Sequence, residues 1–547
     1  MKKLYNWKFA LFMSVFIALL LLSSVLYADF VTLPSENWSK YITLYQSDVT
    51  DQTQNYYDDI FDVVDYDHQL LLTFSDKQKL HFNILNLSGE IQKSFTYDLN
   101  TNVKKISTEI NLNVLTVLIA TETTLNQYNF NLSDFTLNAQ AEITNHFESV
   151  KLDGKNAVVY VDDTFYFFNG TNLNFVSENS KVEQFDFQLD QNKLFINLLE
   201  YNLGGYYFSL YRYDINHDEL FYKENMQKVN AISGTISLDT DLFIKEDHLY
   251  NCMILKNTKY GQNFETNLIV DKNTLDIIES VDSSNMSYDP NTQFVSYNDQ
   301  VYIAYNDKSF IGKLEIGSQF KTYTNVFLRP ITKGQEIEQL PFKILTKSQN
   351  YAPNFKFITV DKLDYLITNE IDHGQNVLYI SSNEPNIIKQ STKLALTDYQ
   401  NIFFGALTYI PASLMTSWMV IIGLLFPVIF VVIPIAIIKM NWVERNPIKM
   451  LYSAILAYLL VKIYYVFSNF DLLLFSNTSM GTPPFHLSSV FLSSLTFIFT
   501  TGISLLCIHL FLKNKPQTHF ITAFFFFFVF EMIQYLFYIT TYAVMYM

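Results

Sequence analysis

Four long apolar runs, separated by short polar connections, occupy the last quarter of the chain. They cover approximately residues 413–438, 450–467, 487–512 and 520–545. A helix of roughly 20 apolar residues is long enough to cross the hydrocarbon core of a bilayer, which is about 30 Å thick. The pattern therefore predicts an α-helical membrane domain of four transmembrane helices within residues 401–547.

The charges between these runs predict their orientation. The connection between the first and second runs carries Lys439, Arg445 and Lys449, and the connection between the third and fourth carries Lys513 and Lys515. The connection between the second and third runs has no Lys or Arg. Because basic loops stay in the cytoplasm, we expect both the segment before the first run and the end of the chain to lie outside.

The start of the chain predicts the same orientation. Lys2, Lys3 and Lys8 precede an apolar stretch that ends near Ala28. This pattern is typical of a cleaved signal peptide or of an uncleaved signal anchor, and the sequence leaves both open. Either one predicts a multi-pass protein of the cell membrane with residues 29–400 as its large extracytoplasmic domain. The abundance of Asn, Lys, Ile, Tyr and Phe is typical of an AT-rich bacterial genome.

From Phe61 onward the pattern changes to short runs in which apolar and polar residues alternate. The runs are rich in Val, Ile, Tyr, Phe and Thr and end at Asp, Asn, Ser or Gly, which is typical of β-strands. A short apolar strand recurs and is expected to begin a repeated unit of strands. It is found at residues 70–74, 114–119, 157–161, 194–198 and 301–305.

Candidate hairpin turns set the length of this repeat. They fall at Ser88-Gly89, Ser133-Asp134, Asn169-Gly170, Asn216-His217, Asn273-Thr274, Gly317-Ser318 and Asn383-Glu384. Most of the intervals match the roughly 40 to 50 residues of a four-stranded propeller blade. We therefore predict an all-β extracytoplasmic domain, a β-propeller of six to eight blades, in which a strand within residues 30–45 pairs with the last blade and closes the ring. The alternative is a pair of β-sandwich domains.

The charge of the chain bears on its partners. The total is −16, and both the first 28 residues and the residues from 401 onward contribute +3, which leaves −22 for residues 29–400. So acidic a surface repels nucleic acid, and we expect no nucleic-acid partner. The surface is expected to be solvated or to meet a cationic ligand.

No motif in the sequence indicates a reaction. The motifs of zinc proteases, α/β-hydrolases, P-loop NTPases and dinucleotide-binding proteins are missing, and we predict no cofactor and no catalytic residue. Asp214, Asn216 and Asp218 alternate as in a calcium loop, but Glu219 stands where that loop needs Gly. This segment is therefore expected to be a hairpin turn, and no metal site is predicted.

Two charged residues lie inside the predicted spans. Lys462 is 12 residues beyond Met450, and Glu531 is 11 residues beyond Phe520, so both lie roughly 17 Å from the cytoplasmic end of their spans. Charges at that depth are costly unless they are paired or hydrated, and we predict that Lys462 and Glu531 face each other. Residues at helical spacing extend a polar stripe along the two spans: Tyr458, Tyr465, Gln534, Tyr535 and Tyr538.

Two roles are open for this pair. It either fixes how the helices pack, or it senses, gates, relays protons or binds a ligand. The favoured function is a membrane-anchored binding or sensing protein that recognises a ligand or protein through its propeller and assembles with another membrane protein through its helices. The alternative is a membrane enzyme or small transporter that uses the Lys462–Glu531 pair with the propeller as a cap. A structural protein of the cell envelope is a third possibility, and the sequence does not identify the ligand.

Overall fold

The chain folds into two compact units in a computed structural model. One unit contains Leu33–Ser309 and Thr322–Thr392, and the other contains Lys393–Met547. The structure describes residues 33–393, with short gaps and four longer ones at 48–57, 310–322, 332–342 and 347–353. Of the C-terminal part it describes most of residues 428–468, together with 489–514 and 518–531.

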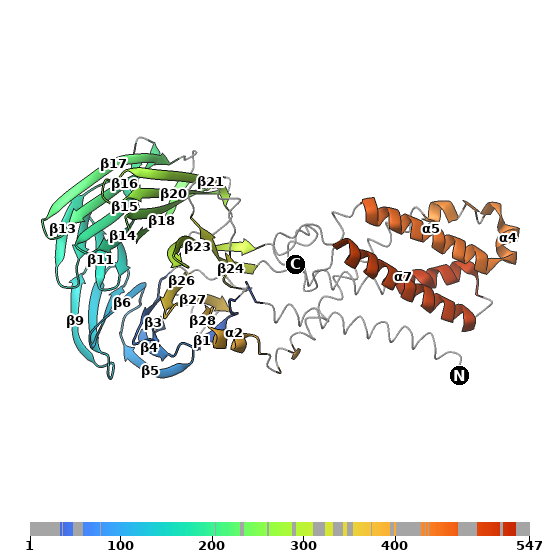
Figure 1. The fold of residues 1–547 in the computed structure, drawn as a ribbon, viewed down its shortest axis with the longest axis horizontal. Helices are drawn as coiled ribbons and strands as arrows, with labels where there is room; N and C mark the ends of the chain where they lie inside the picture. The colour runs from blue at the N-terminus through green and yellow to red at the C-terminus, as the bar shows by residue number, and fades with distance from the viewer. Residues whose placement is uncertain are drawn as a thin grey trace. The chain divides into compact units, whose positions relative to one another are not determined.

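The first unit is a β-propeller of seven blades, each a four-stranded antiparallel sheet (Figure 1). Blades 1 and 2 contain β2 (Phe61–Asp65), β3 (Leu70–Asp76), β4 (Lys79–Leu85), β5 (Ile91–Asp98), β6 (Lys105–Asn111), β7 (Val114–Ala120), β8 (Leu125–Asn131) and β9 (Leu137–Thr144). Blades 3 and 4 contain β10 (Ser149–Asp153), β11 (Asn156–Val161), β12 (Thr164–Phe168), β13 (Leu173–Glu178), β14 (Val182–Asp190), β15 (Lys193–Asn202), β16 (Gly205–Asp214) and β17 (Glu219–Val229).

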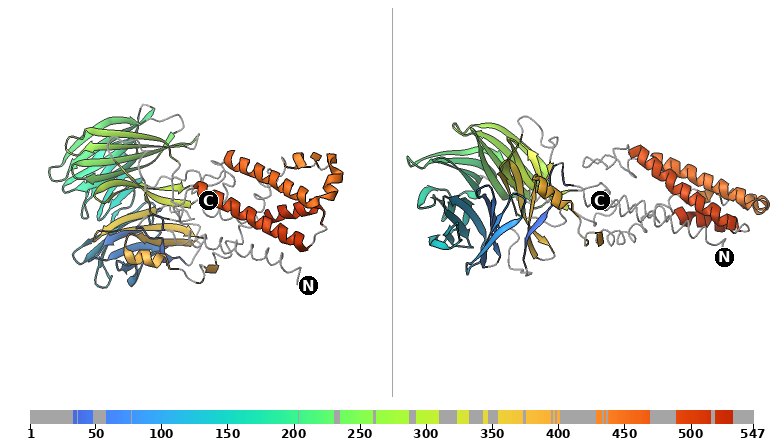
Figure 2. Two further views of the ribbon diagram at one scale, coloured as in Figure 1. Left: turned by 45° about the vertical axis from the view of Figure 1, so that its right-hand side comes forward. Right: turned by 60° about the horizontal axis from the view of Figure 1, so that its bottom comes forward.

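The remaining blades complete the ring (Figure 2). Blades 5 and 6 contain β18 (Thr235–Lys245), β19 (His248–Asn257), β20 (Gln262–Asp271), β21 (Ile277–Met286), β22 (Thr292–Tyr297), β23 (Gln300–Ser309), β24 (Tyr323–Pro330) and β25 (Lys343–Ile344). Blade 7 contains β26 (Asn354–Val360), β27 (Leu363–Asp372), β28 (Gln375–Ser382) and β1 (Ile42–Gln46). The prediction of six to eight blades is confirmed with seven, and the two-sandwich alternative is wrong.

The ring closes through its first strand. β1 pairs antiparallel with β28, with Ile42 opposite Ile380 and Gln46 opposite Val377. Blade 7 therefore combines strands from both ends of the propeller sequence, which removes the exposed edges that a linear array would leave. The predicted closing strand is confirmed.

The hydrophobic core lies between neighbouring blades. Seven clusters of buried side chains each join two adjacent blades; one joins Phe82 of blade 1 to Val117 of blade 2, and another joins Phe61 of blade 1 to Tyr365 of blade 7. The middle strands are covered on both faces and so are almost continuously apolar, as β7 and β15 show. These apolar strands are the second strands of their blades, and the expectation that they begin the repeat is wrong by one strand.

Five of the predicted turns connect the third and fourth strands of blades 1 to 5. Gly89 and Gly170 have φ values of 77° and 86° there, which glycine adopts without strain. Gly317-Ser318 lies outside the described residues. The prediction for Asn383-Glu384 is wrong, because the Glu384 carboxylate accepts a hydrogen bond from the Ile387 backbone N–H and begins helix α2 (Pro385–Ser391).

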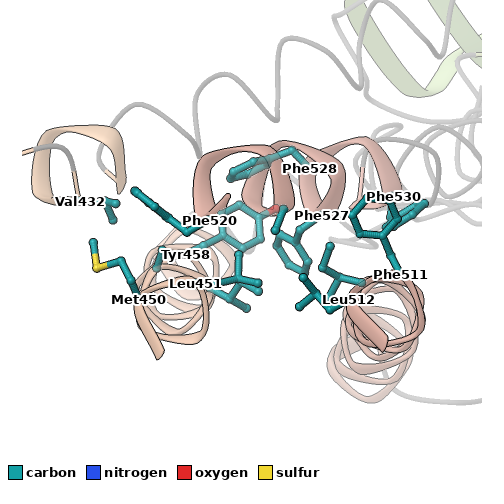
Figure 3. Packing of buried hydrophobic residues seen from close by; sticks show 14 of the residues in the cluster. Val432, Met450, Leu451, Tyr458, Phe511, Leu512, Phe520, Phe527, Phe528 and Phe530 are labelled. Carbon is teal, nitrogen blue, oxygen red and sulfur yellow. The ribbon is translucent and has the colours of Figure 1, made fainter. Parts of the chain in front are cut away.

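The second unit is helical. It contains α4 (Met440–Arg445), α5 (Pro447–Ser468), α7 (Ser489–Asn514) and a helix at Phe520–Glu531. Tyr458, Phe511, Phe520 and Phe527 belong to the apolar cluster that joins these helices (Figure 3).

Within the described residues of this unit, one helical segment, Pro447–Tyr464, is long and apolar enough to cross a membrane. Two shorter apolar helices lie at Thr501–Lys513 and Phe520–Glu531. Much of the first predicted span, residues 413–427, lies outside the description. Four transmembrane helices therefore stay a prediction.

Candidate functional site

Lys462 and Glu531 form a buried ion pair in the helical unit. The Lys462 Nζ of α5 lies 2.8 Å from Oε2 of Glu531, the last described residue of the helix Phe520–Glu531. The two side chains are 1% and 0% exposed. The structure thus brings together the two residues that the sequence places at equal depth; whether the pair acts in function stays a prediction.

Two further side chains complete this group, which we call the helix-core polar site: Tyr458, Lys462, Thr501 and Glu531. Tyr458 donates a hydrogen bond from its hydroxyl to Glu531 Oε2 at 3.2 Å, and Lys462 Nζ donates one to Thr501 Oγ1 of α7 at 2.8 Å. The aromatic rings of Phe527 and Phe528 stand nearly perpendicular to the Tyr458 ring, with interplanar angles of 84° and 90°. The site therefore connects three helices inside an apolar surround.

Within the described part of the chain, one oxygen of this site has no donor. Glu531 Oε1 is buried and, within the described residues, makes no hydrogen bond. A buried carboxylate oxygen without a donor is costly and readily accepts a proton or a hydrogen bond from a ligand. Within the described residues, Oε1 is thus an open acceptor for the donor group of a ligand while Lys462 holds Oε2.

The rest of the predicted polar stripe is described only in part. Tyr458 belongs to the helix-core polar site, as its spacing from Lys462 predicts. Tyr465 lies on α5, and its side chain is outside the description. Gln534, Tyr535 and Tyr538 lie beyond the described residues.

The propeller contains a second polar group, which sequence reasoning missed. The first strands of neighbouring blades contact one another around the ring, so their polar side chains converge on the propeller axis. We call the charged residues on or next to these strands the axial charge cluster. Its members come from six of the seven blades: Asp59, Asp62, Lys105, Lys151, Asp153, Asp186, Asp239, Asp241 and Lys356.

Some members of this cluster connect one blade to the next. Asp62 accepts a hydrogen bond at 2.7 Å from the backbone N–H of Thr108 in the following blade. Asp186 bonds the N–H of Leu242 at 2.9 Å in the same way. Two further links repeat the pattern, from Asp241 to the Phe294 N–H at 2.6 Å and from Gln293 to the Phe357 N–H at 3.3 Å. An acceptor on one first strand thus fixes the position of the next first strand.

Other members form ion pairs. Lys151 Nζ lies 3.4 Å from Asp239 Oδ1, which joins blade 3 to blade 5 across blade 4, and Lys356 Nζ lies 2.9 Å from Asp59 Oδ2. Lys105 donates a hydrogen bond to the Val150 carbonyl oxygen at 2.8 Å. Charged groups of non-adjacent blades are therefore within reach of one another at the axis.

The crowding of these charges changes their ionisation. Loss of water on burial, followed by the Lys151 ammonium, lowers the pKa of Lys105 to about 8. Asp153 keeps an exposed surface at the end of β10, and there a partial loss of water, followed by the carboxylates of Asp186 and Asp62, raises its pKa to about 6. The axis therefore holds groups that exchange protons close to neutral pH.

The sequence does contain a signal for this cluster. In two blades a strand with Asp or Lys at alternate positions precedes the apolar strand, in the segments 149–153 and 235–245. Alternation places those charges on one face of a strand. Only a closed ring of blades brings them together, because most partners lie about 45 to 90 residues apart in the chain, and Lys356 and Asp59 lie 297 residues apart.

The segment that resembles a calcium loop is a turn. Asp214 Oδ1 accepts hydrogen bonds from the backbone N–H groups of Asn216 and His217 at 3.0 and 3.2 Å, between β16 and β17. The prediction of a hairpin turn is confirmed. Across the described part of the chain, no group of three or more His, Cys, Asp and Glu side chains is placed to hold a metal ion.

No protein-family model and no curated protein matches this chain. Among solved structures, the chain is similar to the WD40 domain of Toxoplasma gondii coronin, with 11% identity over 63% of this chain and 84% of that one and a TM-score of 0.39. It is also similar to the Dos1 propeller, with 8% identity over 62% of this chain and 94% of that one and a TM-score of 0.36.

A third similar structure is that of polysaccharide lyase Uly1. The identity is 9% over 63% of this chain and 97% of that one, and the TM-score is 0.40. The propeller assignment stands on the seven blades of the chain itself.

Proposed function

We propose that this protein is a membrane-held binding or sensing protein whose propeller recognises a ligand or protein partner outside the cell. The observation that carries this proposal is the convergence of charges of both signs, from six blades, at the axis of a closed ring. A β-propeller commonly mediates ligand or protein binding, and no catalytic motif stands beside the cluster. Recognition by the axial charge cluster is therefore favoured over a reaction there.

The helical unit supports the membrane part of the proposal. α5 contains a segment that is long and apolar enough to span a bilayer, and the apolar runs before and after it extend the pattern. The basic connections, with Lys439, Arg445, Lys449, Lys513 and Lys515, support a cytoplasmic location for these loops. We propose a multi-pass topology with the propeller outside, and assembly with another membrane protein through the helices.

A second candidate function rests on the helix-core polar site. Glu531 is buried with a carboxylate oxygen that has no donor within the described residues. This favours a proton-relaying or ligand-binding role inside the bundle, as in a small transporter or membrane enzyme. A ligand that co-purifies with the bundle, and is lost on Glu531→Gln, would support this second function.

The main proposal is tested by chemical cross-linking on membranes, affinity purification of the full chain and mass spectrometry. Wild type is compared with Asp153→Asn, which removes an axial charge and keeps the side-chain shape. The control is Asp299→Asn, which removes an exposed charge from the turn between β22 and β23. We expect a partner that wild type and the control recover and that Asp153→Asn recovers poorly. Equal recovery by all three chains contradicts the recognition site.

A further inference from the structure

The helical unit contains an apolar cavity of about 500 Å³ next to α4 and the helix Phe520–Glu531. Ten of its twelve lining residues are apolar: Ile429, Val432, Ile437, Met440, Val443, Phe520, Ile521, Phe524, Phe525 and Phe528. The other two are Glu444 and His519. Its size lies within the range of roughly 300 to 1,000 Å³ that is typical of ligand sites.

Several side chains that line this cavity also remain open to the surroundings. Ile437 is 70% exposed, Ile521 is 60% exposed and Phe525 is 63% exposed. In water such an apolar surface would be unfavourable, whereas a hydrocarbon chain covers it at no cost. The cavity is therefore suited to a long, flexible apolar group.

Cations are adjacent to the same cavity. Lys439 and Arg445 are the residues at the two ends of α4 and stand next to the lining residues Met440 and Glu444. Lys449 follows in the first turn of α5. These three side chains are exposed, and none has a carboxylate partner within the described part of the chain. Together with Glu444 they give this rim a net charge of +2.

We propose that the helical unit binds an anionic phospholipid at this cavity, with an acyl chain inside it and the phosphate group against Lys439 and Arg445. The two parts of the ligand match the two parts of the site. Ten apolar side chains of the cavity suit an acyl chain, and the rim, whose net charge is +2 with Glu444 counted, attracts a phosphate group. Basic pockets between helices at the cytoplasmic side of a membrane are suited to lipid head groups, and that is the side to which the basic loops are assigned.

This proposal goes beyond the proposed function and is tested separately from it. The full chain is purified in a neutral detergent, and the binding of phosphatidylglycerol and phosphatidylcholine is compared by native mass spectrometry. We expect wild type to retain one phosphatidylglycerol and to prefer it over phosphatidylcholine. Lys439→Gln/Arg445→Gln removes two of the cations at the rim. Loss of two cations at a membrane surface corresponds to about 30-fold weaker binding of an anionic lipid, and we expect this loss for phosphatidylglycerol.

Two further variants distinguish the site from a general charge effect. Lys93→Gln/Lys362→Gln removes the same number of cations from exposed positions of the propeller and should leave lipid binding unchanged. Ile521→Trp, at an exposed lining position, should occupy the cavity and weaken retention of both lipids. Circular dichroism checks that each variant keeps its helices.

The proposal is overturned if folded wild type retains no phospholipid, or retains the two lipids equally. It is also overturned if the control variant loses the preference as strongly as Lys439→Gln/Arg445→Gln. None of these results depends on whether the propeller has a partner, so failure here is distinguishable from failure of the proposed function.

Discussion

The Glu531 side chain has no exposed surface, and its partner Lys462 is almost as deeply buried. A buried pair of this kind contributes little net stability, because two charges must lose their water, but removal of one partner leaves the other uncompensated. The energetic role of each residue is therefore visible only when the two are changed separately and together.

We expect Glu531→Gln to lower the free energy of unfolding of the helical unit by about 3 to 5 kcal/mol, because the buried Lys462 loses its carboxylate counter-charge. The double variant Lys462→Met/Glu531→Gln should recover part of this loss. Thermal unfolding in detergent measures both, with Leu460→Ala, at a position 61% exposed, as the control. If Glu531→Gln is as stable as wild type, Lys462 and Glu531 do not form an ion pair that the helical unit depends on.

A second residue-scale prediction concerns Asp153. Partial loss of water at this exposed side chain, followed by the carboxylates of Asp186, Asp62 and Glu109, holds its pKa at about 6, above the ordinary 3.8, while the Lys356 ammonium opposes the shift. A raised carboxyl pKa gives stability below about pH 4 that is lost as the pH rises through 6.

Asp153→Asn should therefore unfold at a higher temperature than wild type at pH 8. The difference should shrink as the pH falls through 6 and disappear below about 4. Asp299→Asn, in the turn between β22 and β23 and outside the axial charge cluster, serves as the control. A stability difference for Asp153→Asn that does not change with pH would contradict the electrostatic origin of the shift.

At the scale of elements, the blades are held by two kinds of contact. Apolar clusters fill the space between adjacent sheets, and single hydrogen bonds join the first strands at the axis. The apolar contacts tolerate small sliding movements, whereas an acceptor that meets one backbone N–H fixes the register between blades. We therefore expect the hydrogen-bond acceptors at the axis to determine the alignment of neighbouring blades more than the free energy of unfolding of the propeller.

Asp241 tests this. Burial, followed by the neighbouring carboxylates of Asp186 and Asp239, raises the pKa of Asp241 well above the usual range. The Asn side chain of Asp241→Asn therefore resembles the neutral form of Asp241, and it keeps an acceptor for the Phe294 N–H. We expect Asp241→Ala to cost about 1 to 3 kcal/mol and to speed hydrogen exchange at the Phe294 amide, with Asp241→Asn close to wild type. If the Phe294 amide exchanges at the wild-type rate in both variants, the hydrogen bond from Phe294 to Asp241 does not fix the position of β22.

The sequence predicts those elements whose signal is local. The depth of Lys462 and Glu531 follows from counting along a helix, and Gly89 and Gly170 mark their turns because the chain needs positive φ there. The apolar second strands are visible because blades cover both of their faces. The first strands escaped notice because their Asp and Lys side chains face an axis that exists only after seven blades close, and Asp62 and Thr108 are far apart in the chain.

At the scale of the whole molecule, the two units need different surroundings. The propeller has a solvated acidic surface and its own seven clusters, whereas the helical unit has exposed apolar side chains such as Ile438 at 79% and Phe430 at 71%. A chain that joins such units is stable when a membrane covers the second and water the first. This difference supports the proposed membrane location of the helical unit, and the basic loops support the proposal that the propeller lies outside.

The most direct test of this topology is thiol labelling of intact cells. The two native cysteines, Cys252 and Cys507, are buried and should stay silent. Leu112→Cys adds a thiol at a propeller turn that is 91% exposed, and Arg445→Cys adds one at the exposed end of α4. A membrane-impermeant maleimide should label Leu112→Cys on intact cells and Arg445→Cys only after permeabilisation. The reverse pattern would contradict the account.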